Sequence, residues 1–111
     1  MTDEFKSKDA TTYTVKLYVA GPIEDAKRVI RRAAFPKGLC VTIEPTLYIY
    51  AGGEEAGYVV GLLQYPRYPE EESSIFQKAE VLLIELIKAT DQWSGLMVSP
   101  TLTRFVSRRP E

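Results

Sequence analysis

Tyrosines at alternating positions are the side chains in this sequence best placed to bind a ligand. Tyr18, Tyr48 and Tyr50 stand at even positions of segments in which apolar and polar residues alternate. Because successive residues of a strand point to opposite faces of its sheet, the even-numbered residues of these segments share a face. Tyr58 joins them if its strand pairs in the register that keeps even residues together, and Lys16 adds a cation. The pattern predicts an aromatic surface that stacks on bases or anchors a protein partner.

A proline-rich loop supplies a second candidate binding element. The run Tyr65-Pro66-Arg67-Tyr68-Pro69 places a tyrosine before each of its two prolines. A residue that precedes proline favours extended backbone, and prolines stiffen a loop. Tyr65, Arg67 and Tyr68 are therefore expected to contact a partner at a low entropic cost. The alternative is a rigid linker whose tyrosines pack against the start of the next helix.

The residue types present exclude most common catalytic and metal sites. The sequence contains no histidine, which is the usual general base and the commonest metal ligand, and Cys40 is its single cysteine. Glu54 and Glu55 form a carboxylate pair, but a turn between glycines is wet, which removes the pKa separation that acid–base catalysis needs. We therefore predict no catalytic residue, no metal ligand and no cofactor. A small enzyme with carboxylate or tyrosine chemistry, in a pocket that gathers Glu44, Tyr48 and Glu54, is one alternative.

The charge balance is close to neutral. The chain carries 14 basic and 15 acidic side chains, for a net charge of −1. This balance argues against a protein that mainly binds the phosphate backbone of duplex DNA. The first residues lack the layout of a signal peptide, and no apolar run approaches the roughly 18 residues of a membrane span. We expect a soluble cytoplasmic protein without membrane contact.

The order of predicted elements indicates an α+β fold built on one sheet. The expected segments are a strand at 13–20, a helix at 22–35, a strand at 39–50, a hairpin turn at 51–55, a strand at 57–63, a helix at 74–90, and strands at 95–99 and 103–107. This βαββαβ order is the split βαβ plan of a ferredoxin-like sandwich with a short extra C-terminal strand, and both helices are expected over the odd-numbered face. Pro45 favours a sheet edge for its strand, whereas the doubly apolar strand 57–63 is expected to be central. Residues 12–111 form the predicted single domain, after a disordered lead-in at 1–11.

One segment resembles a nucleic-acid-binding family. Residues 16–21, Lys-Leu-Tyr-Val-Ala-Gly, resemble the first-strand motif of RNA-recognition domains, which implies that Tyr18 stacks on a base. Gly57 and Tyr58 match part of the companion motif of that family, and Val60 stands where the family has a second aromatic residue.

Other segments resemble further families. Residues 13–22 are similar to the start of the KaiB family of thioredoxin-like clock proteins, whose strand–helix middle segment is replaced here by a hairpin. Residues 18–22 are similar to nucleoside deoxyribosyltransferases, whose catalytic carboxylates have no counterpart at matching positions. The sequence also resembles small proteins of phages and mobile elements, at residues 16–21, 38–42, 52–57 and 65–67. That last resemblance implies a compact accessory protein that binds a host or defence component and has no catalytic residues.

These observations predict a non-enzymatic binding protein, such as a phage-type accessory factor or inhibitor, that acts through the aromatic face and the Tyr-Pro-Arg loop. A protein partner or a second copy in a homodimer is favoured over nucleic acid, because the chain lacks strong positive charge. An RNA-recognition-like binder of single-stranded nucleic acid or of a nucleotide is the other alternative.

Overall fold

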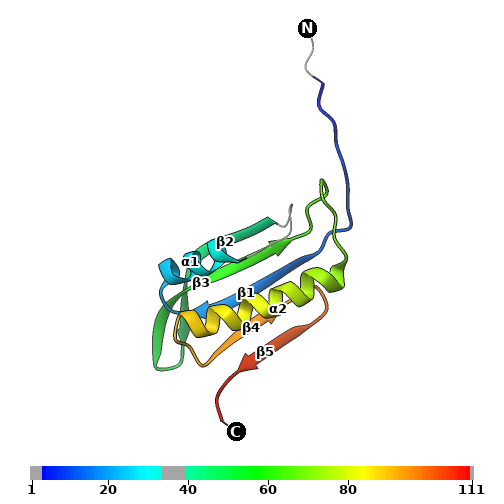
Figure 1. Ribbon diagram of the computed structural model, residues 1–111. Helices are drawn as coiled ribbons and strands as arrows, with labels where there is room; N and C mark the ends of the chain where they lie inside the picture. The colour runs from blue at the N-terminus through cyan, green and yellow to red at the C-terminus, as the bar shows by residue number, and fades with distance from the viewer. Residues whose placement is uncertain (1–3, 34–39, 111) are drawn as a thin grey trace.

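The computed structural model describes residues 4–33 and 40–110, which form a five-stranded sheet and two helices (Figure 1). In chain order the elements are β1 (Thr14–Ala20), α1 (Ile23–Arg32), β2 (Cys40–Tyr50), β3 (Gly53–Leu63), α2 (Glu72–Ala89), β4 (Ser94–Val98) and β5 (Thr103–Ser107). The strands lie in the order β2-β3-β1-β4-β5, and each neighbouring pair is antiparallel. The expected ferredoxin-like α+β fold is confirmed, with β5 as the extra strand.

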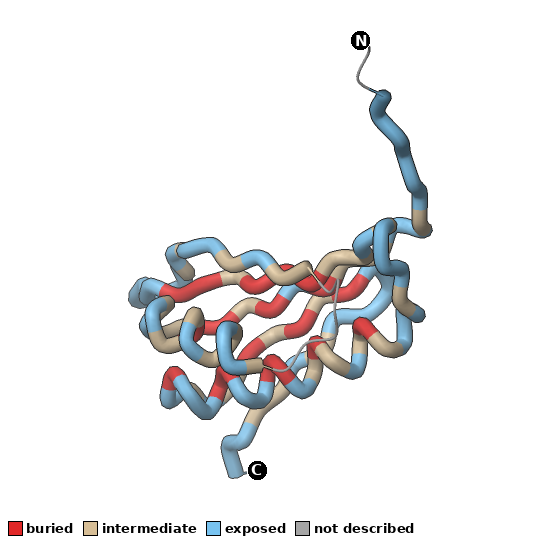
Figure 2. Tube along the Cα trace, turned by 45° about the horizontal axis from the view of Figure 1, so that its top comes forward, coloured by how far each residue is buried: buried red, intermediate tan, exposed pale blue. Residues whose placement is uncertain are grey.

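The core lies between the sheet and the two helices, which cover the same face of the sheet (Figure 2). Val15, Leu17 and Val19 of β1 are buried there, as the alternation of their segment predicts. The helix α2 packs its apolar stripe along the sheet, with Leu83 fully buried. The shorter helix α1 lies beside α2 and buries Ala26. The packing of α2 therefore supplies most of the helical side of the core.

The positions of β2 and β3 in the sheet follow from their sequences. Pro45 has no backbone N–H to donate to a ladder, and its strand β2 is at the sheet edge. The strand β3 lies between β2 and β1, and its residues Val60 and Leu62 are fully buried. Both predicted placements are confirmed.

The hairpin between β2 and β3 is tighter than the sequence suggests. The strand β3 begins at Gly53, opposite Tyr50, so the turn consists of Ala51 and Gly52 and not of residues 51–55. Gly52 has a φ of 90°, a left-handed conformation that glycine adopts without steric strain. The shorter turn changes which residues of β3 face which side of the sheet, and it places Tyr58 on the side of the helices.

Other element limits differ by a few residues. The helix α1 ends at Arg32, and the expected continuation of this helix and the start of the next strand fall in residues 34–39, outside the described chain. The helix α2 begins at Glu72, two residues before the predicted start. Of the predicted lead-in, residues 1–3 lie outside the described chain, and residues 4–13 have no regular secondary structure.

The extra strand β5 determines which surface stays uncovered. It pairs with β4 from Thr103, opposite Val98, to Ser107, opposite Ser94. It therefore extends the sheet sideways and does not cross it. Across residues 4–33 and 40–110, no helix or strand lies over the sheet face opposite to α1 and α2 (Figure 1).

Two kinds of feature are absent from the described part of the chain. None of its helices is long and apolar enough to cross a membrane. No group of three or more His, Cys, Asp or Glu side chains in it is arranged to hold a metal ion.

Candidate functional site

Strand register sets which side chains share the sheet face that the helices leave uncovered. Residues that pair across neighbouring strands point to the same face. Tyr18 of β1 lies opposite Val59 of β3 and Leu96 of β4, and these two lie opposite Glu44 of β2 and Phe105 of β5. One row of five side chains therefore crosses all five strands. We call this row, Glu44–Val59–Tyr18–Leu96–Phe105, the central row, and the face that carries it the open face.

A second row on the open face is more polar. It consists of Thr42, Gly61, Lys16, Val98 and Thr103, in strand order from β2 to β5. Lys16 therefore lies on the predicted face, beside Tyr18. Within the described residues, Lys16 has no ion-pair partner, and neither does Glu44, which belongs to the central row.

The central row is apolar from β3 to β5. Val59, Tyr18 and Leu96 are partly exposed, although they lie in the three inner strands of the sheet. Phe105 is 64% exposed at the free edge. An apolar strip of this kind, with polar residues at its margins, is typical of a surface that another molecule covers.

Tyr48 is held flat against the open face and does not project from it. Its hydroxyl donates a 2.8 Å hydrogen bond to the carbonyl oxygen of Tyr58. Its ring occupies the space beside Gly57, where an added Cβ would lie 2.5 Å from the ring carbon Cε2 of Tyr48. Burial raises the pKa of the Tyr48 hydroxyl to about 12. Tyr48 therefore lies on the predicted face, but its ring packs along that face and its hydroxyl is already hydrogen-bonded to Tyr58.

Tyr50 of β2 and the adjacent Glu54 and Glu55 of β3 lie at the hairpin end of the sheet. Tyr50 is 54% exposed and lies beyond the central row. Glu55 lies opposite Tyr48 and shares the open face, whereas Glu54 lies opposite Ile49 and points to the other side. The pocket that a carboxylate enzyme would need, with Glu44, Tyr48 and Glu54 together, is therefore not formed.

The prediction that Tyr58 shares this face is wrong. Tyr58 pairs with Val19 of β1, so its side chain points toward the helices, and it is 0% exposed. Its hydroxyl lies 3.1 Å from Oγ1 of Thr90, which itself donates to the carbonyl of Leu86 over 2.7 Å. Burial raises the pKa of the Tyr58 hydroxyl to about 12. Tyr58 is therefore a core residue.

The Tyr-Pro-Arg loop is ordered differently from the expected extended chain. The amide N–H of Tyr68 donates to the carbonyl of Tyr65 over 2.9 Å, which closes a turn. The two rings lie 6.2 Å apart, and the guanidinium carbon of Arg67 lies 5.4 Å from the ring centre of Tyr68. The side chain of Gln64 holds the loop base through two 2.8 Å hydrogen bonds to the backbone of Glu70. All three predicted side chains are exposed, at the end of β3 away from the hairpin (Figure 1).

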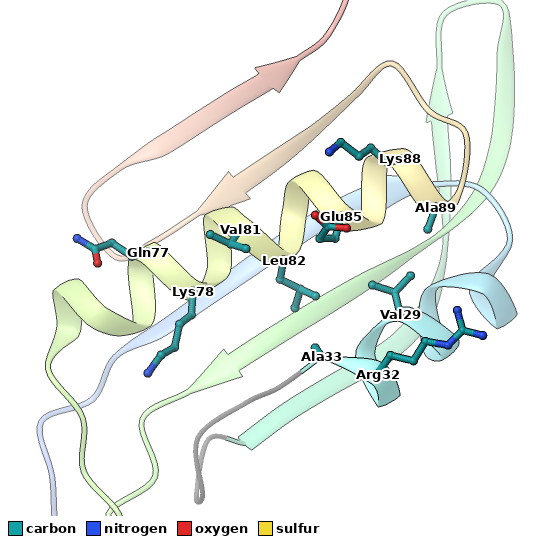
Figure 3. A pocket seen from close by; sticks show the side chains of 10 residues that line it. All are labelled: Val29, Arg32, Ala33, Gln77, Lys78, Val81, Leu82, Glu85, Lys88 and Ala89. Atoms are coloured by element: carbon teal, nitrogen blue, oxygen red, sulfur yellow. The ribbon is translucent and has the colours of Figure 1, made fainter.

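A hollow of about 820 Å³ lies on the other side of the molecule, between α1 and α2 (Figure 3). Val29, Leu82 and Val81 supply its apolar part, and Arg32 and Lys88 lie at its rim. Such a mixture is typical of the seam between two surface helices. Gln77, Lys78 and Glu85 complete its polar lining.

Sequence reasoning found part of the open face and missed its apolar side. The parity of their strands predicts the face of Lys16, Tyr18 and Tyr48 correctly. The predicted face does not include Leu96 and Phe105, although both stand at alternate positions of short strands that the sequence does indicate. The missing information was the position of β5, because only a strand paired with β4 brings Phe105 beside Leu96.

Comparisons with known proteins show the fold of this chain and not its family. No protein-family model matches the sequence, and no curated protein matches it. A solved structure of a phage SAM lyase in its apo state has a TM-score of 0.65 and 10% identity, over 97% of this chain and 99% of that chain. A phage SAM lyase in complex with S-methyl-5'-thioadenosine has a TM-score of 0.60 and 10% identity, over 95% and 96% of the two chains. The shared fold therefore extends over nearly the whole of both proteins.

Proposed function

We propose that this protein is a small cytoplasmic binding protein, of the accessory or inhibitor kind found in phages, that acts through its open face. The observation that supports the proposal is the central row. It places Val59, Tyr18, Leu96 and Phe105 side by side on a surface that neither helix covers.

The exposed side chains of this surface have burial energy still to gain. Burying one side chain of this size contributes about 1.5–3 kcal/mol. Phe105 is 64% exposed and has most of that contribution still to gain. Tyrosine and phenylalanine are also common at the centre of protein interfaces. Tyr65, Arg67 and Tyr68 provide a second, smaller set of exposed contacts at one end of the sheet.

The charges of the open face favour a protein over a nucleic acid. Lys16 is the cation of the two rows, and Glu44 and Glu55 carry negative charge on the same face. Binding to RNA gains most of its affinity from several phosphate contacts. An acidic margin beside a single lysine opposes such contacts, so we expect no salt-dependent binding of single-stranded RNA.

A capture experiment with matched variants tests the proposal. The tagged protein is incubated with bacterial lysate, in parallel with Phe105→Glu on the open face and Val81→Glu on α2. Val81 is 63% exposed and Phe105 is 64% exposed, so the two variants differ in which face of the protein is changed and not in side-chain exposure. We expect proteins that are retained by the wild type and by Val81→Glu to be lost with Phe105→Glu. Identical retention by all three would exclude the open face as the binding surface.

A second candidate function is the binding of S-adenosylmethionine or a related thioether nucleoside on the same face. It is favoured by the fold similarity to a phage SAM lyase, one of whose structures contains S-methyl-5'-thioadenosine. Such a ligand has an adenine base, which stacks on aromatic rings, and S-adenosylmethionine adds a sulfonium cation, which carboxylates and aromatic faces stabilise. The open face offers the ring of Tyr18, and it offers Glu55 beside the ring of Tyr48.

Adjacent glutamates give this candidate an internal control. Calorimetric titration with S-methyl-5'-thioadenosine and with S-adenosylmethionine measures binding, and chromatography of the second mixture measures any release of the thioether. Glu55→Gln is expected to weaken the binding of the sulfonium, whereas Glu54→Gln, on the opposite face, leaves it unchanged. Absence of heat and of product with the wild type would eliminate the candidate. Equal effects of the two substitutions would place the ligand elsewhere.

A further inference from the structure

We propose that the partner of the open face is the open face of a second copy of this chain. The inference rests on the proposed function, because it names the occupant of the same surface. It follows from three features of that surface: its opposite charges, its area and its shape.

Two of the three unpaired charges on the open face, Lys16 and Glu44, are placed so that a second copy can pair both; Glu55, the third, lies nearer the hairpin. Lys16 on β1 and Glu44 on β2 lie on either side of β3, two residue pairs apart along the strands. A two-fold axis between two facing sheets can exchange these two positions. When it does, Lys16 of one copy faces Glu44 of the other and the reverse contact forms by symmetry. One surface thus supplies two ion pairs without any other partner.

The area of the open face suits an interface between two proteins. Five strands of five to eleven residues form the sheet. At strand spacings of about 4.8 Å and rises of about 3.3 Å per residue, they present roughly 600 Å² of sheet. A standard interface buries about 800 Å² of accessible surface on each partner, and side-chain relief makes the accessible area larger than the flat one. A small ligand would cover a fraction of this face and leave Phe105 in water.

The shape of the open face also suits a second sheet. Gly57 and Gly61 of β3 have no side chains, and the Tyr48 ring and the Thr42 hydroxyl lean into the space that their Cβ atoms would fill. Val59 stands between these two glycines on the same face, so a projecting side chain alternates with low positions along β3. Face-to-face packing of two sheets needs such a surface, with side chains that interdigitate across about 10 Å.

Charge reversal tests the pairing through the mass of the protein in solution. Sedimentation velocity over a range of concentrations is expected to show wild-type particles of at least twice the 12.5 kDa chain mass. Lys16→Glu and Glu44→Lys each bring like charges together, so each is expected to weaken association roughly tenfold or more. The double variant restores opposite charges and is expected to recover most of the association. Lys88→Glu on α2, exposed on the helix side, is the matched control and should change nothing.

The outcomes separate this inference from the proposed function. A wild type that is monomeric at every concentration overturns self-pairing, and so does association that none of the reversals alters. If that monomer still captures proteins in a Phe105-dependent manner, the binding function stands with a different partner. If the double variant fails to recover although circular dichroism shows it folded, the Lys16–Glu44 contact is wrong. A Phe105→Glu variant then reports independently, because loss of association in it supports the face itself as the interface.

Discussion

Replacing Tyr58 by phenylalanine removes one buried hydroxyl and tests whether this side chain lies in the core and not on the open face. The Tyr58 side chain is 0% exposed, and its hydroxyl lies 3.1 Å from Oγ1 of Thr90. The Thr90 hydroxyl donates its own proton to the carbonyl of Leu86 over 2.7 Å. The shared bond must therefore be donated by Tyr58. This direction makes the two ends of the bond unequal.

The expected magnitudes follow from what each substitution leaves behind. Tyr58→Phe leaves Thr90 with its bond to Leu86, so the free energy of unfolding should fall by about 1 kcal/mol, the net value of one hydrogen bond. Thr90→Val leaves the Tyr58 hydroxyl buried without a partner, at a cost of about 1–3 kcal/mol. In the double variant that hydroxyl is absent. The double variant should therefore lose less unfolding free energy than the sum of the losses of the two single variants.

Urea unfolding of the four proteins measures these differences. Tyr50→Phe, at a tyrosine that is 54% exposed, is the control and should stay within about 0.5 kcal/mol of the wild type. A loss for Tyr58→Phe no larger than that of the control would refute the buried hydrogen bond. Strict additivity of the Tyr58 and Thr90 losses would refute the bond between them.

Two further predictions concern the same strands. Gly57→Ala should lower the free energy of unfolding by about 1–3 kcal/mol, because the new Cβ would lie 2.5 Å from both the Tyr48 ring and the Val19 carbonyl oxygen. Gly53→Ala, whose Cβ would lie 3.3 Å from a flexible ring, should cost less in the same urea experiment; the reverse order contradicts the packing. Stability should also fall as the pH rises from about 10 through about 12, because burial raises the folded-state pKa of Tyr48 and Tyr58 to about 12. A stability that is constant up to pH 12, measured by urea unfolding at each pH, would show that these hydroxyls are not buried.

The sign of the alkaline effect follows from proton binding. Above pH 10, tyrosines of the unfolded chain lose their protons while Tyr48 and Tyr58 keep theirs in the folded chain. The folded state then binds more protons, so each increase in pH favours unfolding. Below pH 10 both states are protonated and the contribution of these two residues is complete.

Strand order could be predicted because it depends on single residues with strong preferences. Pro45 cannot donate to a ladder and so belongs at an edge, and the apolar residues of β3 on both faces place it inside. The alternation of Val15, Leu17 and Val19 likewise fixed their burial against the helices.

The position of Tyr58 could not be predicted, because it depends on the length of a turn. A turn of five residues at 51–55 would pair even residues of β2 with even residues of β3. The observed turn of Ala51 and Gly52 pairs even-numbered residues of β2 with odd-numbered residues of β3. A register shift of one residue moves every side chain of a strand to the other face of the sheet. Two adjacent glycines are compatible with either turn, so the sequence offers no local signal that selects one.

The apolar half of the open face was missed for a similar reason. The sequence predicts a strand at 103–107, but a strand can extend a sheet or lie across it. Its pairing with β4 brings Phe105 into line with Leu96 and Tyr18. This choice is decided by competition among tertiary contacts, which alternation along one segment does not report.

Hydroxyl-radical footprinting of Phe105 tests most directly whether a second copy of the chain covers the open face. Phe5, 96% exposed and in the segment before β1, is a reference of the same residue type in the same chain. We predict that the oxidation of Phe105, which is 64% exposed, falls relative to that of Phe5 as the protein concentration rises. A constant ratio from dilute to concentrated protein would contradict the pairing of open faces.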